Sequence, residues 1–361
     1  MFSDSNLNTR PTIPDALKEM HLFETGVTFN NNVQKWKHNR KLLIEGVGRP
    51  RFIRSIAPKI NGQMEDILPL LDTIATAGIP VLANRMFSLI SMDVIMDVVF
   101  SVRNQEVVEY LKCVMDGTDS QQPFLDTMHA MTEGMSLLLS SSSWMRRWIP
   151  KVRSEVKKFN RSLLEFEQFL DNKIQEKRES LSSHPSSDHI DFSTSLLLDA
   201  ETSKPENLRE LHANLRASIV GGTETSSNAM AFLTYELARQ PVIQDAIAQE
   251  VQQVVGEGRI ESEHVGKLVL VEACIHETLR LHSVASLVSR RIETENYTFG
   301  AYKLARGAAL MVPTHTNHTS DSLWKDPFKF DPVRFLDGEK GAGPQGKEFA
   351  YTPFGGGVRK W

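Results

Sequence analysis

The segment that most constrains the fold is residues 206–240, which contain no proline before Pro241. It predicts a single helix of about 34 residues, about 50 Å long at 1.5 Å per residue. A helix of that length crosses a whole domain, so the rest of the chain must pack around it. Shorter helices are expected from Pro241 to about residue 256 and from about residue 262 to His282.

The rest of the sequence indicates a mostly α fold with a minor β part. From about residue 32 to 169, apolar residues recur three and four positions apart, which is typical of successive helices. A Ser-rich surface loop is expected over 180–195, between a helical block at 1–179 and the remainder at 196–361. Alternation with glycines near residues 297–314 predicts a small hairpin, followed by Pro- and Gly-rich loops. We expect one domain over 1–361.

Charge and motif content argue against two classes of function. The chain has 45 acidic and 41 basic residues, with no long block of either sign, so its charge gives no sign of nucleic-acid binding. The segment GAGPQGKE, residues 341–348, nearly matches a phosphate-binding loop. However, Glu348 replaces the hydroxyl that would bind magnesium and Pro344 removes a backbone donor. Nucleotide binding is therefore disfavoured.

The cysteine content and the lengths of the apolar segments bear on the cellular compartment of the protein. Cys113 and Cys274 are the only two cysteines and are far apart in sequence, which indicates a reducing compartment without a disulfide framework. No stretch of about 18 apolar residues and no signal-peptide pattern occurs. No metal ligand is assigned from the sequence.

Glu277 and Arg280, in ETLR, lie three residues apart on one expected helical face. Such a pair is usually a surface ion pair worth about 0–1 kcal/mol. Here the flanking residues are apolar, so a charge needs further partners. Arg334, in DPVRF, supplies a second cation. A buried carboxylate held by two guanidiniums would clamp the loop to the helix, and removing one member would cost about 3–5 kcal/mol.

The segment VGGTETSS places two glycines in the middle of the long helix, where each costs about 1 kcal/mol against alanine. One interpretation is a close helix crossing that needs small residues at Gly221 and Gly222. The other is a locally opened helix that admits a small ligand, with Glu224 and Thr225 placed to handle protons. The segment alone does not decide between them.

WKHNR places Trp36 and Arg40 four residues apart on one helical face. Both side chains donate hydrogen bonds, which suits an anionic group such as a carboxylate. Taken alone, an ordinary aromatic–cation pair on the surface is the more common explanation.

The order of these motifs along the chain, ending in PFGGGVRK, resembles that of the cytochrome P450 family of haem-thiolate monooxygenases. The resemblance covers nearly the whole chain and implies haem as cofactor, with Glu224 and Thr225 as proton-delivering residues and Glu277, Arg280 and Arg334 as a structural triad. It also implies that the haem propionates and faces are contacted by Trp36, Arg40, Arg359, the weaker candidate Arg291, Gly221, Gly222, Phe354 and Gly357.

One position departs from the family pattern F-x-x-G-x-R-x-C. Phe354, Gly357 and Arg359 match it, but Trp361 stands where the cysteine belongs. An indole N–H only donates, so it cannot replace the thiolate that ligates iron. Neither Cys113 nor Cys274 occupies the position, so this chain is expected to be inactive.

The resemblance implies a monooxygenase that hydroxylates a small apolar organic substrate with O₂ and electrons from an NADPH-dependent reductase or a ferredoxin, at the cytosolic face of the endoplasmic reticulum membrane. The chain itself is expected to be a fragment that lacks the N-terminal region, any membrane anchor and the residues from the ligand onward. A cysteine codon split by an intron that is read through would give Trp and a stop. Divergent loss in a non-enzymatic helical protein that binds a partner or an apolar ligand is the alternative.

Overall fold

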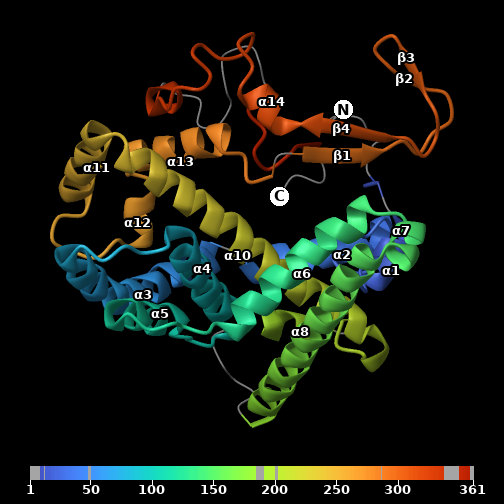
Figure 1. The fold of residues 1–361 in the computed structure, drawn as a ribbon, viewed down its shortest axis with the longest axis horizontal. Helices are drawn as coiled ribbons and strands as arrows, with labels where there is room; N and C mark the ends of the chain where they lie inside the picture. Colours follow the sequence, from blue (N-terminus) through green and yellow to red (C-terminus); the bar gives the residue numbers. More distant parts are fainter. Residues whose placement is uncertain are drawn as a thin grey trace. The chain divides into compact units, whose positions relative to one another are not determined.

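The computed structural model describes residues 9–11, 13–47, 50–183, 191–199, 202–285, 287–336 and 349–357. Arg359, Trp361 and the 341–348 segment lie outside these residues. The described part is mostly helical with two small sheets (Figure 1), which confirms the predicted fold class. Its contacts divide the chain into two compact units, Thr12–Glu224 and Met1–Pro11 with Thr225–Trp361.

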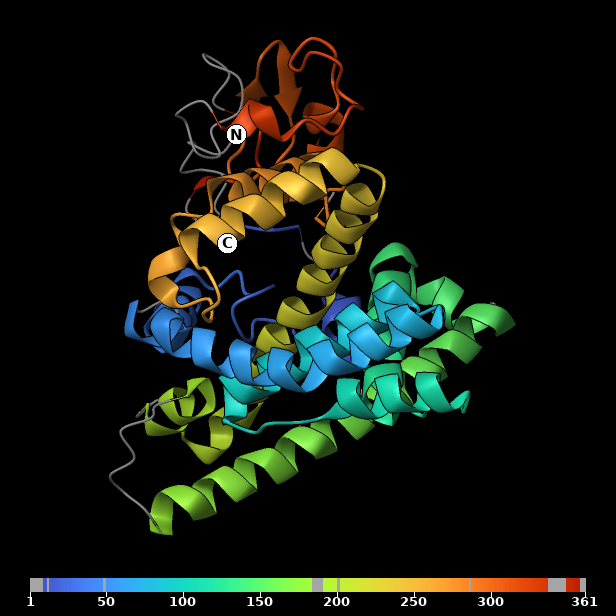
Figure 2. The same ribbon diagram turned by 90° about the vertical axis from the view of Figure 1, so that its left-hand side faces the viewer.

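The unit Thr12–Glu224 is helical. Its elements are α1 (Pro14–Glu19), α2 (Val33–Val47), α3 (Pro50–Ala77), α4 (Ala83–Phe100), α5 (Glu106–Asp116), α6 (Pro123–Ser140), α7 (Ser143–Trp148), α8 (Pro150–Ser183), α9 (Phe192–Leu198) and the first part of α10 (Leu208–Ala238). α6 packs along α8, the long green helix of Figure 2. At Gly134 a Cβ would lie 2.6 Å from atoms of the buried Phe159, so glycine permits this approach.

α10 confirms the predicted long helix, over Leu208–Ala238, after a short 3₁₀ turn at Pro205–Asn207. The helix is continuous through Gly221 and Gly222, so the interpretation of a locally opened helix was wrong. The close-crossing interpretation fits Gly222, where a Cβ would lie 2.7 Å from the end of the Ile95 side chain on α4. Gly221 has open space in front of it.

The expected surface loop over 180–195 is helical at both ends. α8 continues to Ser183, and α9 begins at Phe192. The Asp191 side chain caps α9 by accepting a hydrogen bond from the Thr194 amide, and Phe192 is buried. A cap and a buried aromatic residue therefore outweigh the serine content of this segment.

The other unit contains the second part of α10, the remaining helices and both sheets. Its elements are α11 (Pro241–Val254), α12 (Ser262–Val265), α13 (Val269–Leu281), β1 (Leu287–Arg291), β2 (Tyr297–Phe299), β3 (Tyr302–Leu304), β4 (Ala309–Pro313), α14 (Thr314–His318) and a 3₁₀ turn at Pro332–Phe335. The helix predicted over 262–282 is two helices, because α12 ends at Val265, with Gly266 as its C-cap, and α13 starts only at Val269.

The sheets of this unit are two antiparallel pairs. The predicted hairpin is present as β2 with β3, where Tyr297 faces Leu304. β4 pairs instead with β1, with Ser289 opposite Met311, and Thr9 bridges to Arg291 at the end of β1. Within the described residues, no helix combines the length and the apolar character needed to cross a membrane.

Candidate functional site

Glu277 and Arg280 form a fully buried ion pair on α13. The Arg280 Nε and Nη2 atoms each donate to a different Glu277 carboxylate oxygen over 2.7 Å, so the pair is bidentate. The Asp331 amide donates to Glu277 Oε1 over 2.8 Å, and Arg334 Nε lies 3.4 Å from the same oxygen. The structure thus brings together the three residues that the sequence grouped, around one buried carboxylate.

The remaining donors of Arg280 fix the chain beyond α14. Arg280 Nη1 donates to the carbonyls of His318 and Pro327, both over 2.7 Å, and Nη2 donates to that of Lys329 over 3.3 Å. The guanidinium also lies 5.0 Å from the ring centroid of Trp324. A single buried cation therefore satisfies a carboxylate, the last carbonyl of α14 and two carbonyls of the loop that follows.

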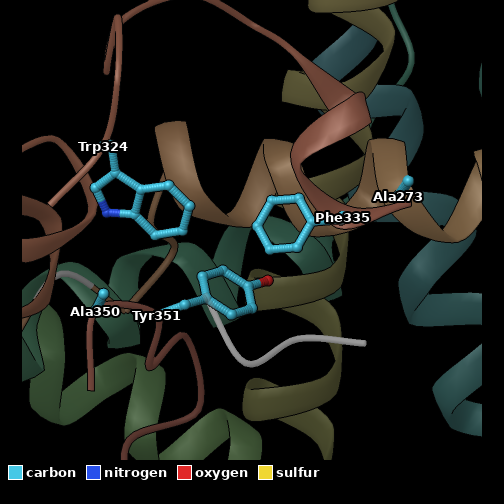
Figure 3. Packing of buried hydrophobic residues seen from close by; sticks show 5 residues of the cluster. All are labelled: Ala273, Trp324, Phe335, Ala350 and Tyr351. Atoms are coloured by element: carbon cyan, nitrogen blue, oxygen red, sulfur yellow. The ribbon is translucent and has the colours of Figure 1, made fainter. Parts of the chain in front are cut away.

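The loop 349–357 leads toward the expected ligand position and is anchored to the same unit by two histidines. The Thr352 amide donates over 2.9 Å to Nε2 of the fully buried His318. His276 Nδ1 lies 2.9 Å from the Tyr351 hydroxyl. Tyr351 belongs to an aromatic cluster with Ala273, Trp324, Phe335 and Ala350 (Figure 3). Burial raises the pKa of the Tyr351 phenol well above its usual range.

His318 is held as a neutral imidazole. Because Nε2 accepts from the Thr352 amide, Nδ1 carries the proton and faces Ser283 Oγ at 2.8 Å. Burial, aided by the positive charge of Arg280, lowers the pKa of His318 to about 4. The loop contact therefore depends on an uncharged histidine.

Strand β1 holds the glycine turn of this loop through Arg290. Arg290 is buried and its Nη2 donates to the Gly356 carbonyl over 2.9 Å. The turn needs glycine, since Gly355 and Gly357 both have φ +72°. Phe354 is about half exposed. Arg291 points to the other face of the strand, where its Nε lies 3.7 Å from Glu293 Oε1 and its amide donates to the Thr9 carbonyl.

In the other unit, α2 presents Trp36 and Arg40 together. Asn32 caps the helix by accepting from the amides of Gln34 and Lys35. Trp36 is buried, Arg40 is partly buried, and the guanidinium lies 5.4 Å from the indole centroid. The aromatic–cation pair therefore exists, on a helix face that is not fully exposed.

The orientation of α2 is set by buried polar contacts with α10. Asn39, one residue before Arg40, donates to Glu210 and accepts from the Asn214 side chain over 2.7 Å. Gly26, with φ +63°, also donates its amide to Glu210 and packs on Ala213, where no Cβ would fit. These contacts fix α2 and the first part of α10 as one assembly.

Glu224, in the GGTETS segment, lies beside a residue that the sequence did not suggest. Glu224 Oε1 lies 3.4 Å from Nε2 of His129 on α6. The Glu224 side chain is one-quarter exposed and that of His129 is 37% exposed. Thr225, the next residue on α10, is exposed. A partly exposed imidazole thus lies beside the carboxylate of Glu224.

Comparison with known proteins decides the family. The sequence profile of the family described as Cytochrome P450 matches residues 3–360. This chain belongs to the cytochrome P450 family. A probable cytochrome P450 516A1 of Dictyostelium discoideum is 25% identical over 344 residues, which cover 93% of this chain and 66% of that protein. Strychnine-11-hydroxylase of Strychnos nux-vomica is 24% identical over 331 residues, covering 90% of this chain and 62% of that enzyme.

These figures mean that the chain spans about two thirds of the length of such P450 relatives. Among solved structures, the retinoic acid-bound cyanobacterial CYP120A1 matches with a TM-score of 0.76 at 20% identity, over 99% of this chain and 74% of that one. At this identity the likeness establishes the P450 fold.

The residues present fit one part of a haem group and not another. Haem is the cofactor of the P450 family. The Trp36 and Arg40 donors match the carboxylates of haem propionates in charge and hydrogen bonding. Neither of the two cysteines lies in the loop 349–357, where the family's thiolate ligand is expected. Cys274 is fully buried in a separate apolar cluster, where burial and the carboxylates of Glu250 and Glu277 raise its pKa to about 12. Cys113 lies on α5 and is partly buried.

Sequence reasoning missed His318, His129 and the role of Arg290. His318 and His129 sit in segments without a distinguishing pattern, and their partners are 34 and 95 positions away. Arg290 was visible beside Arg291, and strand alternation alone predicts that the two point to opposite faces. Only the fold shows which of them reaches the glycine loop.

Proposed function

We propose that the sequence carries the scaffold of a haem-dependent monooxygenase, an oxidoreductase that hydroxylates a small apolar organic substrate with O₂ and electrons from an NADPH-dependent reductase or a ferredoxin. The observation that carries this proposal is the buried Glu277–Arg280 pair with Arg334 beside it, because it anchors the segment from His318 to Asp331. The imidazole of His318 in turn accepts from the Thr352 amide of the loop in which the cofactor's ligand is expected. The resemblance also supports a location of the whole protein at the cytosolic face of the endoplasmic reticulum membrane.

In this proposal the chain's own side chains bind and orient the haem. Trp36 and Arg40, with Arg359, donate to its propionates, and Arg291 is the weaker fourth candidate. The contact surface is completed by Phe354, Gly357, Gly221 and Gly222, of which Gly221 has the open space that a flat ring needs. When bound with its thiolate, haem supplies the activation of O₂.

The proposed proton path uses α10. Glu224 exchanges a proton at Oε1 with His129, which is open to solvent, and Thr225 holds the proton's next position through its hydroxyl. Glu277, Arg280 and Arg334 form the structural triad and take no part in proton transfer, since the carboxylate and Arg280 are fully buried.

We further propose that the sequence as it stands is inactive. Trp361 has no lone pair for iron, and neither cysteine occupies the ligand's position in the family's sequence pattern. Haem would then be held through its propionates and apolar faces alone, so we expect weak binding.

The proposal is tested by titrating the purified chain with haem and following its absorption spectrum. Arg40→Gln removes one charge-assisted hydrogen bond worth about 1.5–3 kcal/mol, so it should weaken binding about 10- to 100-fold. Arg209→Gln is the matched control, because Arg209 is exposed on α10 and is assigned no haem contact. Equal affinity of the two variants would contradict the assignment of Arg40.

A further inference from the structure

Arg290, in strand β1, is a buried cation that donates to two backbone carbonyls. Only 3% of its surface is exposed, and burial lowers the pKa of its guanidinium. Nη1 donates to the carbonyl of Ser289 over 2.8 Å, and Nη2 donates to that of Gly356 over 2.9 Å. Removing a guanidinium from water is unfavourable unless its donors find partners. An arginine is therefore costly at this position unless the contact with Gly356 compensates.

The turn at Gly355–Gly357 needs such a contact. Consecutive glycines have the greatest backbone freedom in the unfolded chain, so ordering them costs the most conformational entropy. Within the loop, the Gly355 amide donates to the Thr352 carbonyl over 3.0 Å. Gly356 is buried, so its carbonyl needs a donor from the protein. Arg290 supplies that donor.

One face of β1 contacts the turn at two points. Val288 and Arg290 are two residues apart in the strand, so their side chains lie on the same face. A Cβ at Gly355 would lie 3.5 Å from Val288 Cγ2, which places this side chain against the turn. β1 is paired with β4 over its whole length, so this face is held rigidly. The start of the loop is anchored separately, through the Thr352 amide and His318.

We propose that Arg290 is a positioning residue for the ligand of the haem iron, an inference that rests on the proposed function. Through Nη2 it fixes the Gly356 peptide, and with it the direction in which the chain leaves the turn. His318 holds the start of the loop, so a chain without Arg290 keeps the loop attached but leaves its glycine end free to move. Arg291 cannot take over, because strand alternation directs it to the other face.

The first test needs no haem. Hydrogen exchange of the purified chain is followed by mass spectrometry on the fragment that contains residues 349–357. Arg290→Met removes the donors but keeps a long apolar side chain. The matched control is Arg306→Met, because Arg306 carries the same charge in the same unit and its side chain is 60% exposed.

Arg290→Met should speed exchange in this fragment about 10- to 100-fold, as expected for the loss of one charge-assisted hydrogen bond. Arg306→Met should leave the exchange rate unchanged. Equal exchange of the fragment in the two variants would overturn the inference.

The second test asks whether Arg290 acts on the ligand or only on the fold. Urea is added to the haem-loaded Trp361→Cys chain, with thiolate ligation followed by the haem absorption spectrum and global unfolding by circular dichroism. Adding Arg290→Met should lower the urea midpoint of thiolate loss more than the midpoint of unfolding, and adding Arg306→Met should lower neither.

Equal shifts of both midpoints by Arg290→Met would mean that the contact only stabilises the fold, which would also overturn the inference. No thiolate ligation in Trp361→Cys with Arg290 intact would contradict the proposed function instead. Hydrogen exchange would then decide by itself whether Arg290 orders the turn.

Discussion

Replacing Glu277 by glutamine is expected to leave a buried guanidinium without a counter-charge. Glu277 is fully buried and accepts two 2.7 Å hydrogen bonds from Arg280 and one of 2.8 Å from the Asp331 amide. Glutamine keeps the shape but turns one acceptor into an NH₂ group that faces the Arg280 donors. Breaking a buried pair in this way costs about 3–5 kcal/mol, a large part of a domain's total stability of about 5–15 kcal/mol.

The matched control is Glu176→Gln on α8. Glu176 also pairs with a residue three positions away, Lys173, at 2.8 Å, but its side chain is 60% exposed. Its substitution should change stability by less than about 1 kcal/mol. Arg280→Met should cost at least as much as Glu277→Gln, because it also strands the carbonyls of His318, Pro327 and Lys329.

The assay is urea unfolding at pH 7, followed by circular dichroism and by tryptophan fluorescence, since Trp324 lies against Arg280. The reasoning is refuted if Glu277→Gln shifts the unfolding midpoint no more than Glu176→Gln does. A change in the slope of the unfolding free energy against urea concentration, rather than in the midpoint, would mean that the substitution alters how the units unfold.

Four further outcomes are expected. Burial lowers the pKa of His318 to about 4, below the value near 6.5 of the unfolded chain. The neutral side chain therefore stabilises the fold above about pH 6.5, and the free energy of unfolding falls by about 2 kcal/mol from pH 7 to pH 5. His318→Gln should remove this fall from the pH profile of urea unfolding. Burial raises the pKa of Asp93 to about 7, so protonation of this carboxyl increases the free energy of unfolding as the pH falls from 7 to 5. Asp93→Asn should remove this increase, which is also about 2 kcal/mol. Gly221→Ala should stabilise the chain by up to about 1 kcal/mol, since a Cβ there meets nothing, whereas Gly134→Ala should destabilise it by about 1–3 kcal/mol by clashing with Phe159; thermal unfolding distinguishes the signs. A thiol reagent should label Cys113 in the native chain and Cys274 only after unfolding, and native labelling of Cys274 would contradict its burial.

The parts of the fold that follow from local pattern were predictable. The long helix follows from a proline-free run, and the grouping of Glu277 with Arg280 follows from helical spacing in an apolar flank. Arg334 required an added assumption, that a buried carboxylate needs a second cation. These predictions rest on rules that act between residues a few positions apart, or on the requirement that a buried charge has a partner of opposite charge.

Most of the features that were missed depend on distant contacts. The exception is Gly266, a local stop signal that follows α12 as its C-cap although the surrounding residues continue a helical pattern. His318 acquires its role only because Arg280 and Thr352 are folded around it. The close approach of α10 to α4 at Gly222 involves Ile95, which comes from a helix more than a hundred residues earlier.

The central claim is that this P450 scaffold has Trp361 where the iron's thiolate belongs. X-ray absorption at the iron edge tests it most directly, on the haem-loaded chain and on Trp361→Cys, with Cys274→Ala included in both. We predict no sulfur neighbour of iron in the unsubstituted chain and one in Trp361→Cys. A sulfur neighbour in the unsubstituted chain, or none in either, would contradict the account.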